Sequence, residues 1–161
     1  MAQPAESFDA QRILGALARH GVDYVLIGGL AVQTHGHMRT TADIDIMPAP
    51  ARANLTLLAA ALSALGARVL NPGAEDPEID VTTLPRAARW QFATRHGALD
   101  VVLEAPGAPP YSELRGRALE VERDELRIPV GGLDDLIAMK RASGRPVDLD
   151  DLAALTAPPP P

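Results

Sequence analysis

The sequence predicts an α/β fold (in the broad sense that includes α+β), with a mixed central β-sheet flanked by helices. Segments with helical spacing of apolar residues alternate with short apolar runs in the first half of the chain. Two pairs of strand-like segments around tight turns predict hairpins in the second half, and helices follow them. Because no linker or repeat divides the chain, we expect one domain over 1–156 and a disordered Pro-rich tail over 157–161.

The first half is expected to begin with a helix and a buried strand. Apolar residues recur at helical spacing over 7–20, with Ser7 as a plausible cap and Gly21 as the stop. The apolar run 22–27 predicts a buried strand that ends at the Gly28-Gly29 pair. The next expected elements are a short helix at 30–35, a strand at 41–47, a helix at 51–65 and a short strand at 67–70.

The second half is expected to start with a loop, because 71–85 is rich in proline, glycine and acidic residues. Alternation over 90–94, a turn at His96-Gly97 and an apolar run over 99–103 predict a hairpin. The remaining expected elements are a hairpin over 118–130 that turns near Asp124, a helix at 133–143 closed by Gly144, and a short helix at 148–155.

Composition limits the possible functions. The chain has 161 residues, 47% of them hydrophobic, and no apolar run approaches membrane length. The first residues lack the basic start and apolar stretch of a signal peptide, so a cytoplasmic location without membrane contact is the expectation. The absence of cysteine excludes disulfides and thiolate metal sites, and a net charge of −6 argues against a strongly basic nucleic-acid-binding surface. A local basic groove from Arg86, Arg89 and Arg95 remains open.

The most informative segment is Asp43-Ile44-Asp45-Ile46, which alternates acidic and apolar residues. On a strand, both carboxylates lie on one face, where they can hold divalent metal ions. Asp100 is a lone acid in another apolar strand, and pairing of the two strands would bring three acids together. Such acids repel one another without a cation, whereas two divalent ions would relieve the repulsion and support phosphoryl or nucleotidyl transfer. The alternative is a solvated strand end with an unrelated exposed acid.

Phosphate-binding candidates lie near this strand in the sequence. The Gly28-Gly29 pair lets a phosphate approach the backbone closely, and Arg39 and Thr40 immediately precede the acidic strand. Lys140 is the sole lysine among fifteen basic residues, and its position at the border of a buried helix stripe would let it reach a triphosphate. The alternatives are a surface ion pair for Arg39 and, for Lys140, a stem that covers apolar surface.

Other polar residues are interpreted as structural. We expect His35 and His37 to serve loop or capping roles, because hard metal ions prefer oxygen ligands. Arg145 and Asp148 are expected to form an ion pair that fixes the last helix.

The spacing of these motifs resembles a known family. Gly28-Gly29, followed after thirteen residues by Asp43-Ile44-Asp45-Ile46, is similar to the signature of the DNA polymerase β-type nucleotidyltransferase superfamily, and 99–102 matches its third carboxylate strand. Segments 39–45 and 136–152 resemble small bacterial nucleotidyltransferases related to the AbiEii toxins.

The resemblance implies a minimal nucleotidyltransferase fold and a metal-dependent enzyme. Such an enzyme would bind a nucleoside triphosphate (NTP) with Mg²⁺ or Mn²⁺ and transfer a nucleoside monophosphate to a hydroxyl of a tRNA or a partner protein. Toxin–antitoxin or phage-defence systems are the implied setting, and a cognate partner protein could supply what so short a chain lacks. By matching position, Asp43, Asp45 and Asp100 would bind the metals and act in catalysis, and Gly28, Gly29 and Lys140 would bind the nucleotide. Arg39 and Thr40 are expected at the same nucleotide because they immediately precede the acidic strand.

Two other classes of function fit parts of the sequence pattern. The short chain is also compatible with a non-catalytic nucleotide-binding or antitoxin-like interaction module, although such a module has no physical reason to keep three repelling acids. Other Asp-x-Asp enzymes, such as glycosyltransferases or aspartyl phosphatases, fit the Gly-Gly spacing or the chain length less well.

Overall fold

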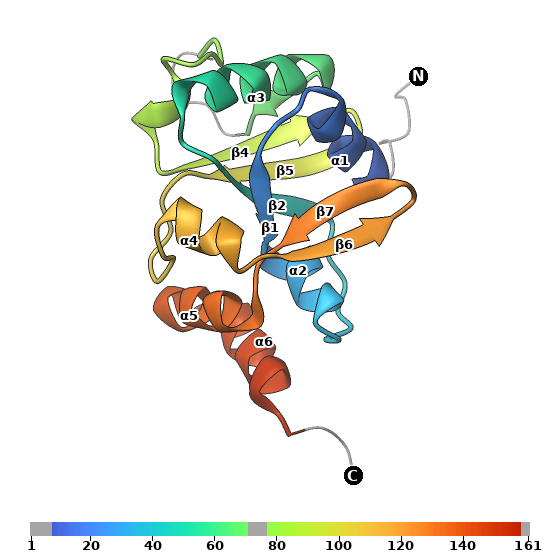
Figure 1. Cartoon of the computed structure of the whole chain (residues 1–161), viewed down its shortest axis with the longest axis vertical. Helices are drawn as coiled ribbons and strands as arrows, with labels where there is room; N and C mark the ends of the chain where they lie inside the picture. Colours follow the sequence, from blue (N-terminus) through green and yellow to red (C-terminus); the bar gives the residue numbers. More distant parts are fainter. Residues whose placement is uncertain (1–7, 71–76, 159–161) are drawn as a thin grey trace.

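The computed structural model describes residues 8–70 and 77–158, and within them the strands form one mixed seven-stranded sheet. The strand order is β3-β4-β5-β2-β1-β7-β6 (Figure 1). The strands are β1 Tyr24–Ile27, β2 Asp43–Pro48, β3 Arg68–Val69, β4 Arg89–Thr94, β5 Gly97–Val102, β6 Leu119–Arg123 and β7 Leu126–Val130. This confirms the predicted mixed sheet with flanking helices.

Helices lie at both ends of the sheet. Figure 1 shows α1 and α3 at one end and α5 and α6 at the other. The helices are α1 Ala10–Arg19, α2 Gly28–Thr34, α3 Arg52–Ala64, α4 Tyr111–Gly116, α5 Leu133–Ser143 and α6 Pro146–Thr156, with a short 3₁₀ turn at Leu84–Arg86. None of the helices in the described ranges combines the length and apolar composition that a membrane crossing requires.

Strand β2 occupies the centre of the sheet because its alternating sequence suits a strand with one face in the core. It pairs antiparallel with β1 and parallel with β5. Ile44 and Ile46 are fully buried, whereas Asp43 and Asp45 are only partly buried on the opposite face. The same register places Asp45 directly beside Asp100.

Several predicted boundaries need correction. The N-cap of α1 is Asp9, whose carboxylate accepts a hydrogen bond from the backbone N–H of Arg12, while the predicted cap Ser7 lies outside the described residues. Helix α2 begins at Gly28, so the glycine pair forms its first turn instead of preceding it. β2 runs from Asp43 to Pro48, whereas the predicted strand covered 41–47. The predicted tail 157–161 lies mostly outside the described residues.

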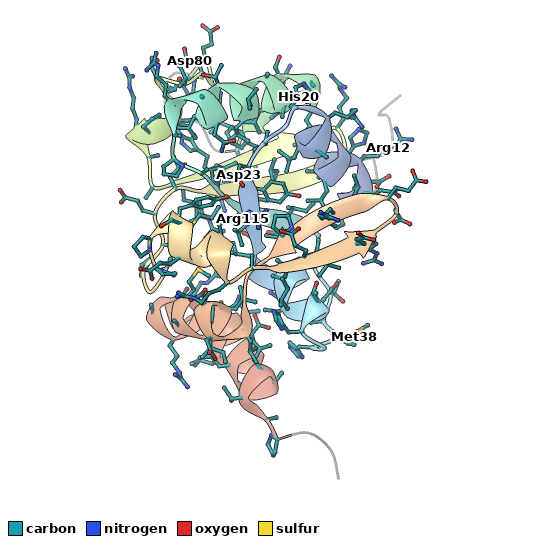
Figure 2. All side chains as sticks on the ribbon, in the orientation of Figure 1. Arg12, His20, Asp23, Met38, Asp80 and Arg115 are labelled. Carbon is teal, nitrogen blue, oxygen red and sulfur yellow. The ribbon has the colours of Figure 1, made fainter. Side chains whose placement is uncertain are left out.

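The second half contains one helix that the sequence did not predict. Helix α4 is held against the start of β1 by Asp23, which accepts a hydrogen bond from Tyr111 Oη at 2.9 Å. The guanidinium of Arg115 lies 3.4 Å from the same carboxylate, and Figure 2 shows Asp23 and Arg115 next to each other. Burial, followed by the contact with Asp23, raises the pKa of Tyr111. Both predicted hairpins and the helix 133–143 are confirmed, with Gly144 in the left-handed conformation at its end.

Candidate functional site

Three carboxylates converge at the middle of the sheet. Asp43 and Asp45 project from β2, and Asp100 projects from the paired strand β5. One oxygen from each lies within 4.8 Å of the others, which makes them the described residues' candidate for holding a metal ion. We call these three residues the acid cluster. The pairing of β2 with β5, on which the sequence-based argument for Asp100 depended, is present.

The acid cluster is electrostatically costly in the absence of a cation. The pKa of Asp45 is raised to about 7, mainly by burial and then by repulsion from Asp43 and Asp100, while Arg89 opposes the rise. Asp43 accepts a hydrogen bond from the hydroxyl of Thr41 at 3.1 Å. An all-oxygen donor set with mutual repulsion fits a hard divalent ion such as Mg²⁺ or Mn²⁺.

Arg89, at the start of β4, contacts two members of the acid cluster. Its guanidinium contacts the carboxylate of Asp100 and lies 3.5 Å from that of Asp45. Arg95 follows the other end of the same strand and lies against Gly66. The two arginines therefore do not form the local basic groove that the sequence left open.

The two glycines at the start of α2 allow a close approach to charged side chains. Gly28 has a φ of +73°, and a Cβ atom there would lie 2.2 Å from Asp45 Oδ2. A Cβ atom on Gly29 would lie 2.6 Å from Arg39 Nη2. Because neither glycine has a side chain, the first turn of α2 can lie close to both the acid cluster and Arg39.

A second charged group lies on the side of α5 and α6. Lys140 is 7% exposed, and its Nζ lies 3.1 Å from Asp148 Oδ1 and 3.0 Å from Asp151 Oδ2. The ammonium is thus held by buried acids, and the alternative of a solvated ammonium on an apolar stem is wrong. Arg145 lies 2.8 Å from Asp148, so the predicted ion pair is present. We call Arg39, Lys140 and Arg145 the cation group.

Arg39 and Thr40 differ in their placement. Arg39 Nε lies 2.9 Å from the fully buried Asp151, so its ion pair is not the surface contact that the sequence left open. Thr40 is exposed and does not line the neighbouring cavity. The histidines lie in the loop after α2, as expected: His35 Nε2 is 2.9 Å from the carbonyl of Gly131, and His37 Nε2 is 3.4 Å from Asp151.

A cavity of about 340 Å³ joins the two charged groups. Its wall includes Asp43, Asp45 and Arg89 together with the whole cation group. Gly28 and Gly29 also line it, whereas Asp100 does not. Apolar residues complete the wall; they include Val102, Pro106, Leu136, Met139 and Val147. The cavity therefore offers acidic, cationic and apolar surfaces to one ligand.

Residues 9–156 match the family described as "Nucleotidyltransferase of unknown function (DUF6036)". The chain belongs to this family. It is therefore a nucleotidyltransferase, and the match includes all the residues of the acid cluster and the cation group.

Several solved structures have a fold similar to that of this nucleotidyltransferase. The lincosamide antibiotic adenylyltransferase LnuA, bound to lincomycin, has a TM-score of 0.63 at 17% identity, over 94% of this chain and 99% of that one. The antibiotic-resistance factor ANT(2'')-Ia has a TM-score of 0.58 at 17% identity, over 90% and 79%. A putative nucleotidyltransferase from Thermotoga maritima has a TM-score of 0.56 at 16% identity, over 89% and 88%. No curated protein matches the sequence.

Sequence reasoning missed Asp151 and the place of Arg89 at the acid cluster. Asp148 and Asp151 lie three residues apart and therefore share a face of α6. This spacing of acids, shortly after the sole lysine, was the available signal for Asp151. Arg89 lacked a signal, because its contact depends on how β4 pairs with β5.

Proposed function

We propose that this nucleotidyltransferase moves a nucleoside monophosphate from an NTP to a hydroxyl, and that Asp43, Asp45 and Asp100 carry the reaction with Mg²⁺ or Mn²⁺. The observation that carries the proposal is the convergence of these three carboxylates beside a cavity that also holds a cation group. Divalent ions held by these carboxylates would supply charge neutralisation for the phosphates.

The remaining residues have matching roles. The oxygen of the acceptor hydroxyl attacks the α-phosphorus, the bond between this phosphorus and the oxygen that bridges to the β-phosphate breaks, and pyrophosphate leaves. Asp100 accepts the proton of the hydroxyl and releases it to solvent. The backbone at Gly28 and Gly29, together with Arg39 and Lys140, binds the triphosphate, whereas Thr40, which lies outside the cavity wall, is given no role in this binding.

We propose a tRNA or a partner protein as the acceptor, in a cytoplasmic toxin–antitoxin or phage-defence system, with residues 1–156 acting as one domain. The similarity of 39–45 and 136–152 to AbiEii-related nucleotidyltransferases supports this choice. LnuA and ANT(2'')-Ia carry names and bound molecules that identify antibiotics as their acceptors. A small hydroxylated molecule therefore belongs among the acceptors tested.

A non-catalytic nucleotide-binding or antitoxin-like module is the alternative against which the proposed function is tested. Under that function, an Asp43/Asp45 double alanine variant would retain full biological activity. Under the proposed function, the same variant loses it, because metal-dependent transfer needs the carboxylates.

The experiment is label transfer from α-³²P nucleoside triphosphates with Mg²⁺ to tRNA, to cell-lysate proteins and to aminoglycosides or lincosamides. Asp43→Ala and Asp100→Asn should reduce transfer by more than about 100-fold, since metal neutralisation contributes several kcal/mol. Asp150→Asn, a neighbouring exposed acid on α6, serves as the control and should transfer normally. Nucleotide binding without transfer to any of these acceptors would contradict the proposal.

A further inference from the structure

Asp151 on α6 is a buried carboxylate without a role in the transfer reaction described above. Its side chain is fully buried, and it lies against two cationic side chains and a histidine ring. Arg39 Nε and His37 Nε2 lie 2.9 and 3.4 Å from Oδ1, and Lys140 Nζ lies 3.0 Å from Oδ2. A buried charge is strongly unfavourable unless it is compensated, so this carboxylate depends on its cations.

The contacts of Asp151 are ion pairs without aligned hydrogen bonds. Neither oxygen of Asp151, nor Arg39 Nε, has a hydrogen-bond partner of good geometry among the described residues, although the separations are short. Attraction between the charges is therefore the main interaction. A neutral side chain of the same shape would not replace it.

Arg39 contacts both the carboxylate of Asp151 and the wall of the cavity. Its Nε faces Asp151, whereas its Nη2 lies against the backbone of Gly29 at the cavity wall. The side-chain amide of Gln33 donates to the carbonyl of Arg39 and fixes the backbone as well. Because a guanidinium is a planar fork, one whose Nε faces a carboxylate can still present its Nη2 to a phosphate, while Nη1 donates to the carbonyl of Thr40 at 3.4 Å.

Lys140 is fixed in a similar way. It lines the cavity, and Asp148 and Asp151 hold its ammonium from the side of α6. Asp151 itself does not line the cavity. Among the described residues, Asp148 and Asp151 are the acids within 4 Å of the cation group, and Arg145 also interacts at longer range with Asp43 and Asp45. The cation group and two members of the acid cluster line the same cavity.

We propose that Asp151 is a positioning residue for NTP binding, which orients Arg39 and Lys140 so that the cavity recognises the β- and γ-phosphates. The inference rests on the proposed function, because it assigns the cation group to the triphosphate. Asp151 links the loop after α2 to both C-terminal helices through these two cations. Without its charge, Arg39 and Lys140 lose the common partner that holds them side by side.

The test measures nucleotide affinity instead of transfer. A ribose-labelled fluorescent ATP is bound to the full-length protein with Mg²⁺ and displaced by ATP, ADP or AMP. Asp151→Asn should weaken ATP binding about tenfold or more, by analogy with the loss of a carboxylate that orients a metal ligand, and leave AMP binding nearly unchanged. Asp150→Asn, exposed on the same helix, is the matched control and should bind ATP as the wild type does.

The outcomes separate this inference from the function on which it rests. Failure of the wild type to bind any nucleotide contradicts the proposed function. Wild-type ATP affinity in a folded Asp151→Asn protein, or an equal loss for ATP and AMP, overturns the positioning role alone. If Asp151→Asn does not fold, Arg39→Lys decides, because one ammonium cannot serve both Asp151 and a phosphate: a similar loss of ATP affinity supports the role, and unchanged affinity overturns it.

Discussion

The guanidinium of Arg89 on β4 contacts the carboxylate of Asp100 on β5, at the point where the three acids converge. The two strands are antiparallel neighbours, and Arg89 reaches back along β5 from its position opposite Val102. It also lies 3.5 Å from Asp45. The protein therefore supplies its own positive charge to the carboxylates proposed to bind metal, and this charge competes with a metal ion.

Arg89→Ala should therefore bind Mn²⁺ more tightly than the wild type. Because 41% of the Arg89 side chain is exposed, solvent screens its charge, and we expect a gain of about fivefold, or roughly 1 kcal/mol. Isothermal titration calorimetry with Mn²⁺, in the absence of nucleotide, measures this affinity. Arg86→Ala, at a nearby exposed arginine, should leave the affinity unchanged. Weaker binding in Arg89→Ala would show that Arg89 supports the metal site instead.

The pKa of Asp45 predicts a pH-dependent stability for the metal-free protein. This pKa rises from 3.8 to about 7 in the folded state, mainly through burial, so the folded protein holds the proton more tightly than the unfolded chain. The contribution of Asp45 to stability is therefore greatest below about pH 4 and is lost as the pH rises through 7. Asp45→Asn should stabilise the metal-free protein at pH 8 by about 1–3 kcal/mol in urea unfolding. No gain at pH 8, or the same gain at pH 4, would contradict this explanation.

Substitution of Gly28 should damage the site through crowding as well as backbone strain. In Gly28→Ala, the new Cβ would lie 2.2 Å from Asp45 Oδ2, at a φ of +73°. Gly21→Ala is the matched control, because Gly21 has a φ of +68° but no atom within 4 Å of the added Cβ. Both variants should lose about 1 kcal/mol of stability through strain. Only Gly28→Ala should also lose Mn²⁺ affinity, and equal affinity in the two variants would exclude crowding.

Asp148 should be essential for docking of the last helix. It is fully buried and accepts hydrogen bonds from Lys140, from the side chain of Arg145 and from the backbone N–H of Arg145. Burial works against the charged form, but the hydrogen bonds from Arg145, Ser143 and Lys140 prevail and lower the pKa of Asp148. Its contribution to stability is therefore present above about pH 4 and is lost on acidification.

Asp148→Ala should cost about 3 kcal/mol in the free energy of unfolding at pH 7, because it removes one of the two acids that hold the buried Lys140 ammonium and the partner of the more exposed Arg145. Urea unfolding followed by circular dichroism measures the loss. The exposed Asp150 provides the comparison, since Asp150→Ala should change stability by less than about 0.5 kcal/mol. A loss that stays the same at pH 3 would contradict the ionic explanation.

Local patterns in the sequence were sufficient to predict the sheet and the acid cluster. Alternation of Asp and Ile sets which face of β2 is buried, and an acid within the apolar run of β5 matches it across the parallel pairing. The two hairpins and α5 also follow from turn residues and spacing. In contrast, α4 depends on Asp23, which is distant in sequence, so its short and weakly patterned segment gave no local signal.

The charged partners of the site were less accessible to sequence reasoning. The sequence indicated Lys140 and Arg39 as phosphate-binding candidates, but it did not indicate their common partner Asp151. This residue lies in a helix with several acids, and burial alone distinguishes it from Asp150. Arg89 contacts Asp100 through the pairing of β4 with β5 and the reach of a long side chain. Such contacts are set by tertiary packing and have no fixed spacing in the sequence.

The residues around the cavity come from elements with different local stability: the acid cluster comes from the central strand β2 and its neighbour β5, and most of the cation group comes from the C-terminal part of the chain. Amide hydrogens in a central strand exchange with solvent only when most of the structure unfolds. The acid cluster projects from β2 and its neighbour, whereas α5 and α6 pack beyond one end of the sheet (Figure 1). We expect hydrogen exchange to be slowest at β2 and faster in α6, so that the cationic wall can open and close around a ligand while the acidic wall keeps its geometry.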